Sequence, residues 1–121
     1  MSKSAIIILS DPKAGLDEST GRLLNALAAA YDYQAAGEEV KIIFQGAGTR
    51  WPAIIQKEDH IANKVYKMVE KNIEGVSAAC TTIWGAEPSG LDLIANNPLP
   101  GTPGLSSFVK LQKEGYTILN F

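Results

Sequence analysis

Two kinds of apolar pattern alternate along this chain of 121 residues. Short continuous apolar runs, many of them β-branched, occupy residues 5–9 and 39–44, as is typical of strands buried on both faces of a parallel sheet. Residues 76–79 and 116–119 have the same short apolar character. We therefore predict four parallel strands in one sheet, with room for only a very short further strand within residues 97–104.

Helical periodicity separates these runs. Residues 20–36 repeat apolar side chains at helical spacing, and Asp17 or Ser19 before them and Gly37 after them favour a capped helix. Residues 59–71 predict a second helix and residues 105–113 a third, while residues 81–94 predict a further, interrupted one. The side chains predicted to face the core are Leu23, Leu24, Leu27, Ala30, Tyr31, Ile61, Val65, Met68, Val69, Leu105, Phe108 and Val109.

Alternating strands and helices predict an α/β fold: a flavodoxin-like, open, mainly parallel sheet with helices on both faces. The length suits a single domain over residues 1–121. In a flavodoxin-like order, strand 5–9 lies between strands 39–44 and 76–79. Ligands bind at such a change of direction, so we predict a crevice at the carboxyl ends of strands 5–9 and 76–79.

Composition narrows the classes of function. Charged residues make up 20% of the chain, the formal net charge is −2, and no basic run is present, so we expect neither nucleic acid nor membrane as a partner. The apolar run at the N-terminus is too short for a signal peptide, and the single cysteine excludes an internal disulfide. These features predict a soluble, cytoplasmic protein with a reduced thiol.

Cys80 is the strongest candidate for chemistry. It follows the strand at 76–79 and precedes a predicted helix, so the helix dipole and free backbone N–H groups would stabilise its thiolate. The other candidate binding residues lie at the ends of the same two strands: Ser10, Asp11, Ser77, Thr81, Thr82 and Trp84. The alternative is that Cys80 only packs, because free cysteine is among the most buried residue types.

The other candidate residues are weaker indications of function. His60 is the only histidine, and its helix face predicts an exposed, non-catalytic residue; no ligand spacing indicates a metal site. Asp11 and Asp17, with Glu18, either orient a ligand or a cysteine, or cap a helix and keep the loop solvated. Trp51 and Trp84 either flank a flat ligand or fill core and subunit interfaces. A flavoprotein is disfavoured, because Ser19-Thr20-Gly21 lies too far from strand 5–9 for a phosphate loop.

The segment from Gly75 to Ala86, GVSAACTTIWGA, resembles the cysteine loop of DsrE/DsrF-like proteins. Residues 24–48 resemble the first half of that family and residues 105–121 its end. The resemblance implies a sulfur-relay protein that carries sulfur as a persulfide on Cys80 without a cofactor. It also implies a homo-oligomer, a trimer or hexamer, with donor and acceptor proteins as partners. Some relatives have a second cysteine where this chain has Ser77, so local dithiol chemistry is not expected.

Two functional hypotheses therefore stand. The first is a small thiol protein that carries sulfur on Cys80. The second is a non-catalytic ligand-binding or oligomeric accessory protein in which Cys80 is buried.

Overall fold

The computed structural model describes residues 2–102 and 104–121. Five strands form one sheet: β1 (Lys3–Ile8), β2 (Glu39–Phe44), β3 (Ile73–Ser77), β4 (Leu93–Ile94) and β5 (Thr117–Asn120). Every neighbouring pair is parallel, and the strand order is β4-β3-β2-β1-β5. The predicted class, an open parallel α/β sheet, is confirmed.

The predicted strand order is wrong. β1 lies between β2 and β5, and β2 separates β1 from β3. Apolar runs identify strands but do not identify their neighbours, because each buried strand offers the same kind of edge. From β1 the chain adds strands on one side up to β4 and then places β5 on the other side of β1. The point at which the strand order reverses therefore lies between β1 and β5, and not between β1 and β3. The carboxyl end of β3, where Cys80 follows, is two strands away from the carboxyl end of β1.

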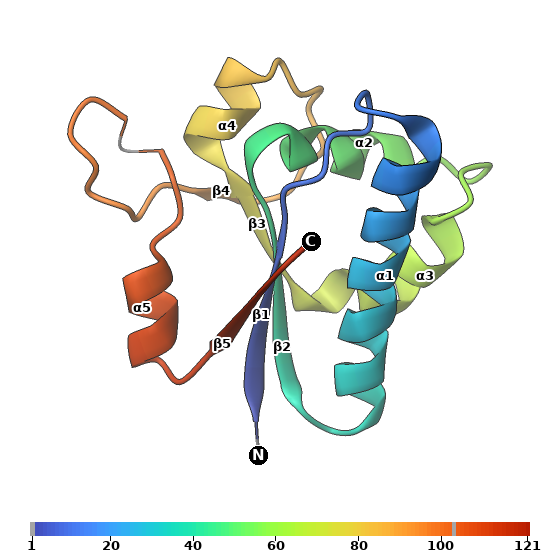
Figure 1. Cartoon of the computed structure of the whole chain (residues 1–121), viewed down its shortest axis with the longest axis horizontal. Coiled ribbons are helices and arrows are strands. Elements are labelled where there is room, and N and C mark those ends of the chain that lie inside the picture. The colour runs from blue at the N-terminus through green and yellow to red at the C-terminus, as the bar shows by residue number, and fades with distance from the viewer. Residues whose placement is uncertain (1, 103) are drawn as a thin grey trace.

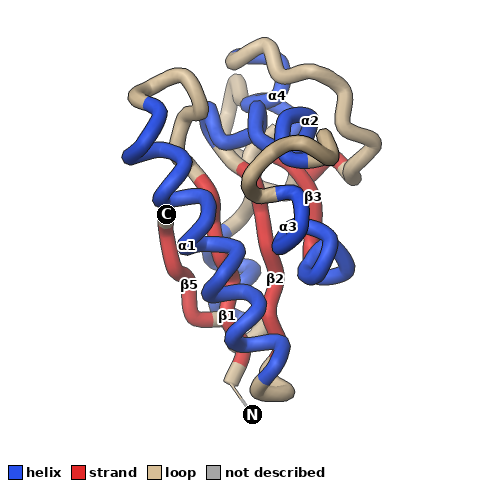
Figure 2. The backbone as a smooth tube through the Cα atoms, turned by 90° about the vertical axis from the view of Figure 1, so that its right-hand side faces the viewer, coloured by secondary structure: helices blue, strands red, loops and turns tan. Residues whose placement is uncertain are grey.

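Helices cover the two faces unequally. On one face, α1 (Leu16–Ala35) and α3 (Asn63–Val69) pack over the larger core cluster (Figures 1 and 2). On the other face, α5 (Phe108–Lys113) covers a smaller cluster that includes Ile7, Ile43 and Leu111. The two clusters alternate along β1, because successive side chains of a strand point to opposite faces.

Shorter elements gather beyond the carboxyl ends of the strands. The 3-10 helix η1 (Gly46–Arg50) runs directly into α2 (Trp51–Ile55), and α4 (Ala78–Ile83) follows β3 without a loop. A second 3-10 turn, η2 (Glu70–Asn72), joins α3 to β3. Figure 1 shows α2 and α4 together at the top of the sheet. This edge holds most of the predicted site residues.

Several predicted inward positions differ from the structure. In α3 the buried residues are Asn63, Tyr66 and Val69, whereas Ile61 is 71% exposed and Met68 is half exposed. The helix begins at Asn63, not at residue 59, because a turn centred on His60 precedes it. The shorter helix presents a different face.

A similar correction applies to α1 and α5. Tyr31 of α1 is 44% exposed, while Leu23, Ala26, Leu27 and Ala30 form its buried stripe. In α5, Val109 is exposed and Leu111 is buried, because the helix begins at Phe108, after its cap Ser107, and not at Leu105. Neither Asp17 nor Ser19 caps α1. Gly15 is the N-cap, and the Ser19 hydroxyl donates to the Gly15 carbonyl within the first turn.

Candidate functional site

The start of α4 forms the immediate surroundings of Cys80. Ser77, the last residue of β3, is fully buried and is the N-cap of the helix. Its Oγ accepts a long hydrogen bond from the Cys80 N–H at 3.5 Å and donates to the Gly104 carbonyl at 2.7 Å. The Thr81 hydroxyl donates to the Ser77 carbonyl at 2.9 Å. Two of the predicted binding residues, Ser77 and Thr81, therefore hold the first turn together.

Cys80 is the third residue of α4 and is 5% exposed. This corrects the expectation that it precedes the helix, because β3 ends three residues before it, at Ser77. The expected free N–H groups are also engaged, since the Ala79 N–H donates to the Gly104 carbonyl and the Cys80 N–H to Ser77. The thiol therefore lies in a closed, hydrogen-bonded turn. Thr82, on the same helix, is exposed.

Gly104 closes this turn by close approach. A Cβ atom at Gly104 would lie 2.4 Å from the Ala79 nitrogen and 2.6 Å from the Ala79 Cβ. Only glycine fits so near a neighbouring backbone. The Gly104 carbonyl can therefore accept from both the Ser77 hydroxyl and the Ala79 N–H at the helix start.

The segment after β2, helix η1, packs against α4. A Cβ at Gly48 would lie 2.1 Å from the Ile8 carbonyl oxygen, so η1 packs directly on the end of β1. The next residue, Thr49, is 2% exposed, and its hydroxyl donates to the carbonyls of Gly46 (2.8 Å) and Cys80 (3.4 Å). The close packing at Gly48 thus places Thr49 where it binds the backbone of Cys80.

Arg50 brings together two more of the predicted residues. Its Nη1 donates to Asp11 Oδ1 at 3.0 Å, and its Nε donates to the Trp84 carbonyl at 2.9 Å. The guanidinium also lies 5.9 Å from the centre of the Trp84 ring, a cation–π distance. Asp11 and Trp84 therefore meet through Arg50. The Lys13 N–H, which also donates to the Asp11 carboxylate, and the Arg50 guanidinium together lower the pKa of Asp11.

Ser10 has a structural partner. Its carbonyl and hydroxyl oxygens both accept from Trp51 Nε1, at 2.9 and 3.2 Å. Trp51 is 2% exposed and belongs to the larger core cluster, whereas Trp84 is 43% exposed. Trp51 therefore fills the core. His60 lies edge-on to Trp51 and its Nδ1 accepts from the Ala62 N–H, so it is half-buried and not exposed as predicted.

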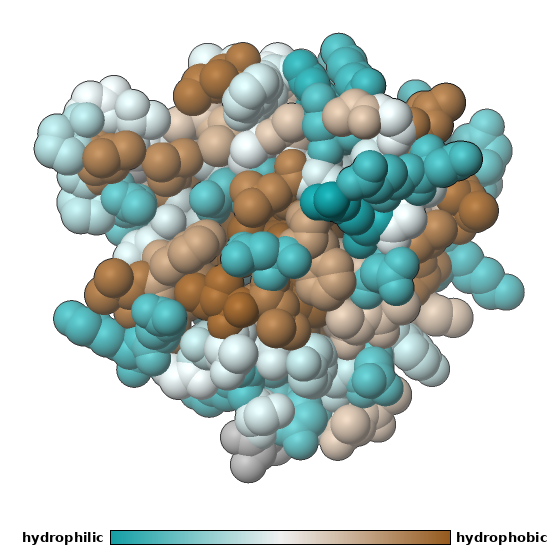
Figure 3. Space-filling model, in the orientation of Figure 1, coloured by the Kyte–Doolittle hydropathy of each residue, from teal (hydrophilic) through white to brown (hydrophobic). Residues whose placement is uncertain are grey.

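Backbone hydrogen bonds continue past the ends of β1 and β5, the two strands between which the strand order reverses. The N–H groups of Leu9 and Ser10 both donate to the Phe121 carbonyl, at 2.8 and 3.3 Å. Apolar side chains gather on the molecular face over β5 (Figure 3). In this part of the chain Leu9 is 42% exposed, and Ile118, Leu119 and Phe121 are half-buried. The predicted crevice between the ends of β1 and β3 does not form, because η1 lies there.

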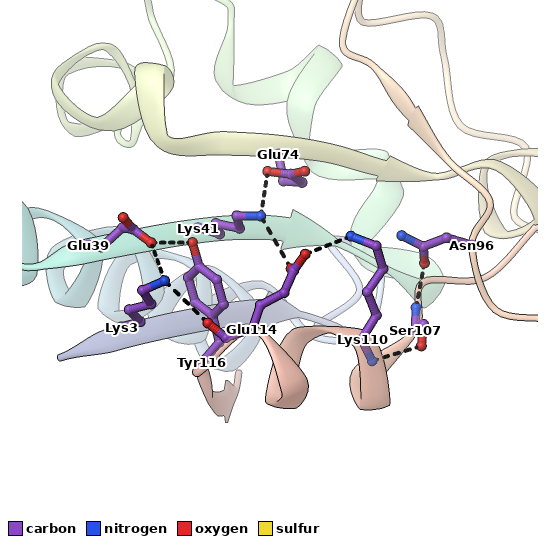
Figure 4. Close-up of polar contacts among 9 residues, drawn as sticks. All are labelled: Lys3, Glu39, Lys41, Glu74, Asn96, Ser107, Lys110, Glu114 and Tyr116. Carbon is purple, nitrogen blue, oxygen red and sulfur yellow. Dashed lines mark hydrogen bonds and ion pairs between the residues drawn. The ribbon is translucent and has the colours of Figure 1, made fainter.

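A network of charges covers the sheet on the α5 side (Figure 4). Lys41 pairs with Glu74 at 3.4 Å, Lys110 with Glu114 at 3.0 Å, and Lys3 with Glu39 at 3.6 Å. Each of the three lysines therefore has a carboxylate partner. We interpret this network as structural.

Tyr116 belongs to the same network. Its hydroxyl donates to Glu39 Oε2 at 2.6 Å. Burial, followed by this bond and the surrounding carboxylates, raises the Tyr116 pKa far above its ordinary range. The same hydrogen bond lowers the pKa of Glu39, with help from Lys3 and Lys41.

Sequence reasoning missed three residues that organise this edge: Thr49, Arg50 and Gly104. Thr49 and Arg50 follow β2, and the rule that ligands lie beyond strand carboxyl ends applies there as it does after β1 and β3. Gly104 lies in a loop rich in glycine and proline, where the sequence offers no sign of which glycine contacts α4.

In the described part of the chain, His, Cys, Asp and Glu side chains nowhere form a group of three or more that could hold a metal ion. Within residues 2–102 and 104–121, no helix has the length and apolar character needed to cross a membrane. Comparison with models of known protein families, with curated proteins and with solved structures gives no match. The resemblance to DsrE/DsrF-like proteins therefore stays a prediction.

Proposed function

We propose that this protein is a small thiol protein that carries sulfane sulfur on Cys80, as its resemblance to the DsrE/DsrF-like family implies. The observation that supports the proposal best is the location of Cys80 in the first turn of α4, beyond the carboxyl end of a parallel strand. Residues that do chemistry in open α/β sheets lie at this edge.

In the proposed reaction the Cys80 thiolate attacks the outer sulfur of a donor persulfide. The sulfur–sulfur bond of the donor breaks, a Cys80 persulfide forms, and the donor leaves as a thiolate. That thiolate takes up the proton that the Cys80 thiol released. Because the chain has one cysteine, no second thiol within it can resolve the persulfide as a disulfide. The sulfur must pass to a separate acceptor. Donor and acceptor are therefore other molecules, and we propose that they are proteins of a sulfur-relay pathway.

Access to the thiol is the main requirement, because Cys80 is 5% exposed. The contact of Gly104 with Ala79 and Ser77 lies at the start of α4. Opening this contact would release the Ser77 hydroxyl and the Ala79 N–H, two donors suited to an anion such as a persulfide. The proposal therefore requires that the turn opens when a donor docks.

Sulfur uptake tests the proposal directly. The protein is incubated with a small-molecule persulfide donor, and its intact mass is measured with and without a reductant. We expect a gain of one sulfur that is reversed by reductant and absent in Cys80→Ser, with circular dichroism showing that the variant is folded. If native protein neither takes up sulfur nor reacts with a thiol-alkylating reagent, the carrier proposal is wrong.

The burial of Cys80 favours a second candidate, an accessory or ligand-binding protein in which this residue only packs. Alkylation separates the two. A Cys80 that reacts only at the rate of global unfolding supports the accessory protein, whereas reaction by local opening supports the carrier.

We also propose that the chain forms a homo-oligomer, with a trimer or hexamer as the expected forms. The half-buried apolar residues of β5 and the exposed Leu9 and Trp84 support an interface. β5 is an edge strand of the sheet, and edges of this kind are commonly covered. Light scattering at micromolar concentration tests this, and a monomer mass would contradict it.

A further inference from the structure

A hollow of about 340 Å³ lies beside Arg50, between the loop after β1, helix α2 and the turn after α4. Its volume falls at the lower end of the range of small-molecule sites. Its lining combines three cations and one carboxylate with small and apolar residues: Pro12, Lys13, Arg50, Ala53, Ile54, Lys57, Gly85 and Glu87. The whole chain has a net charge of −2, so this accumulation of positive charge is local.

Arg50 is held in place by its neighbours. Asp11 binds its Nη1 and the Trp84 carbonyl binds its Nε, and the side chain is only 20% exposed. Its Nη2 makes no hydrogen bond within residues 2–102 and 104–121, and among these residues no side-chain N or O atom is both fully buried and without a partner, so Nη2 is open to solvent. A fixed, partly desolvated guanidinium binds an oxyanion more strongly than a mobile surface side chain does.

The lysines at this hollow differ from those on the α5 side of the sheet. Lys41 and Lys110 pair with carboxylates, whereas the ammonium groups of Lys13 and Lys57 form no ion pair within the described residues. When Asp11 is counted with Glu87, three positive charges face two negative ones, which leaves an excess of one. This excess favours an anion at the rim.

We propose that this hollow binds a small organic anion whose oxyanion group, a phosphate or a carboxylate, is held by Arg50. Lys13 and Lys57 attract the charge from the rim. The apolar body of the ligand lies against Pro12 and the Ala53–Ile54 face of α2. Cys80 is not among the residues that line this hollow, so the proposed site is distinct from the proposed sulfur chemistry.

Matched probes test both halves of the proposal. Phenyl phosphate and benzoate carry an oxyanion on an apolar body, inorganic phosphate carries the charge alone, and phenol carries the ring alone. Binding is followed by nuclear magnetic resonance shifts of backbone amides and by the fluorescence of Trp84, which contacts Arg50. We expect phenyl phosphate or benzoate to bind more tightly than inorganic phosphate or phenol, with the largest shifts at Ile54, Gly85 and Arg50.

Variants assign the binding to these residues. The double variant Lys13→Gln/Lys57→Gln should raise the Kd about fivefold to tenfold, because each screened rim charge is worth roughly twofold to threefold. Arg50→Gln should raise the Kd at least about tenfold, because it removes charge-assisted hydrogen bonds to the oxyanion. Lys64→Gln, at an exposed lysine of α3, is the matched control and should leave the Kd unchanged. The double variant keeps Arg50 and its contacts, so it tests the site even if Arg50→Gln folds poorly.

Several results would overturn the proposal. One is phenyl phosphate and benzoate binding no more tightly than inorganic phosphate. Another is an equal loss of affinity in Lys64→Gln and in the double variant. A third is that none of the probes shifts these amides at millimolar concentration. The ratio of phenyl phosphate to benzoate affinity identifies which oxyanion the site prefers.

Discussion

Replacing Gly104 with alanine tests the closed turn around Cys80. The added Cβ would lie 2.4 Å from the Ala79 nitrogen, whereas real Cβ contacts stay beyond about 3.0 Å. The neighbouring atoms are backbone and Cβ atoms, which cannot rotate away. The loop or α4 must therefore shift by at least about 0.6 Å, the difference between these two distances. Such a shift lengthens the hydrogen bonds from Ser77 and Ala79 to the Gly104 carbonyl.

The expected magnitude follows from those two bonds. A net intramolecular hydrogen bond contributes about 0.5–1.5 kcal/mol, so losing both costs about 1–3 kcal/mol. Alanine also restricts the unfolded chain, which offsets about 0.4–1 kcal/mol. The midpoints of these two ranges, about 2 and about 0.7 kcal/mol, leave a net loss of about 1.3 kcal/mol, so we expect Gly104→Ala to lower the free energy of unfolding by about 1–2 kcal/mol. If the same opening exposes Cys80, its alkylation rate should rise about fivefold to thirtyfold.

Gly21→Ala is the matched control. Gly21 lies inside α1, and an added Cβ there meets no atom within 4 Å. Alanine should stabilise this helix by about 0.5–1 kcal/mol and leave Cys80 reactivity unchanged. Urea unfolding measures both free energies, and mass spectrometry after timed alkylation measures both rates. Equal stabilities of the two variants would refute the packing argument. A destabilised Gly104→Ala with no faster alkylation would show that this loop does not control access to Cys80.

Two predictions concern the effect of pH on stability. The Asp11 pKa is lowered in the folded protein. The ionised Asp11 side chain therefore adds to the free energy of unfolding above about pH 5, and this contribution is lost as the pH falls through the lowered pKa. In urea unfolding, Asp11→Asn should therefore lose less stability between about pH 6 and pH 3 than the natural chain does. An unchanged dependence of stability on pH would count against the Asp11–Arg50 ion pair. The Tyr116 pKa is raised in the folded protein. The protonated Tyr116 hydroxyl therefore adds to the free energy of unfolding below about pH 10, and this contribution is lost as the pH rises further. The Tyr116 hydroxyl should then resist deprotonation in near-ultraviolet titration until the protein unfolds, and Tyr116→Phe should remove that resistant fraction.

The long elements could be predicted from the sequence, but β4 could not: it lies at Leu93–Ile94, inside the predicted interrupted helix 81–94 and outside residues 97–104, and α4 ends at Ile83. Ile6 to Ile8 and Ile42 to Phe44 are fully or almost fully buried, as the continuous apolar runs indicate. The phase of the short helices could not be predicted in the same way. In α3 the difference between a start at residue 59 and a start at Asn63 decides whether Ile61 or Tyr66 faces the core. Seven residues give too few turns for periodicity to fix the start.

The candidate site depends on strand order, and this explains which of its residues meet. With β1 beside β3, the loop after β1 would lie next to α4, and Asp11 would lie near Cys80. In the observed order β2 lies between them, so the segment after β2 fills that place. Thr49 then binds the Cys80 carbonyl and Arg50 binds both Asp11 and the Trp84 carbonyl. Because nothing in a parallel strand's own composition specifies its neighbour, no local pattern could identify Thr49 and Arg50 as the bridging residues. Two consecutive residues of η1 therefore connect α4, which carries Cys80, with the cationic hollow: Thr49 binds the Cys80 carbonyl, and Arg50 binds the Trp84 carbonyl and lines the hollow.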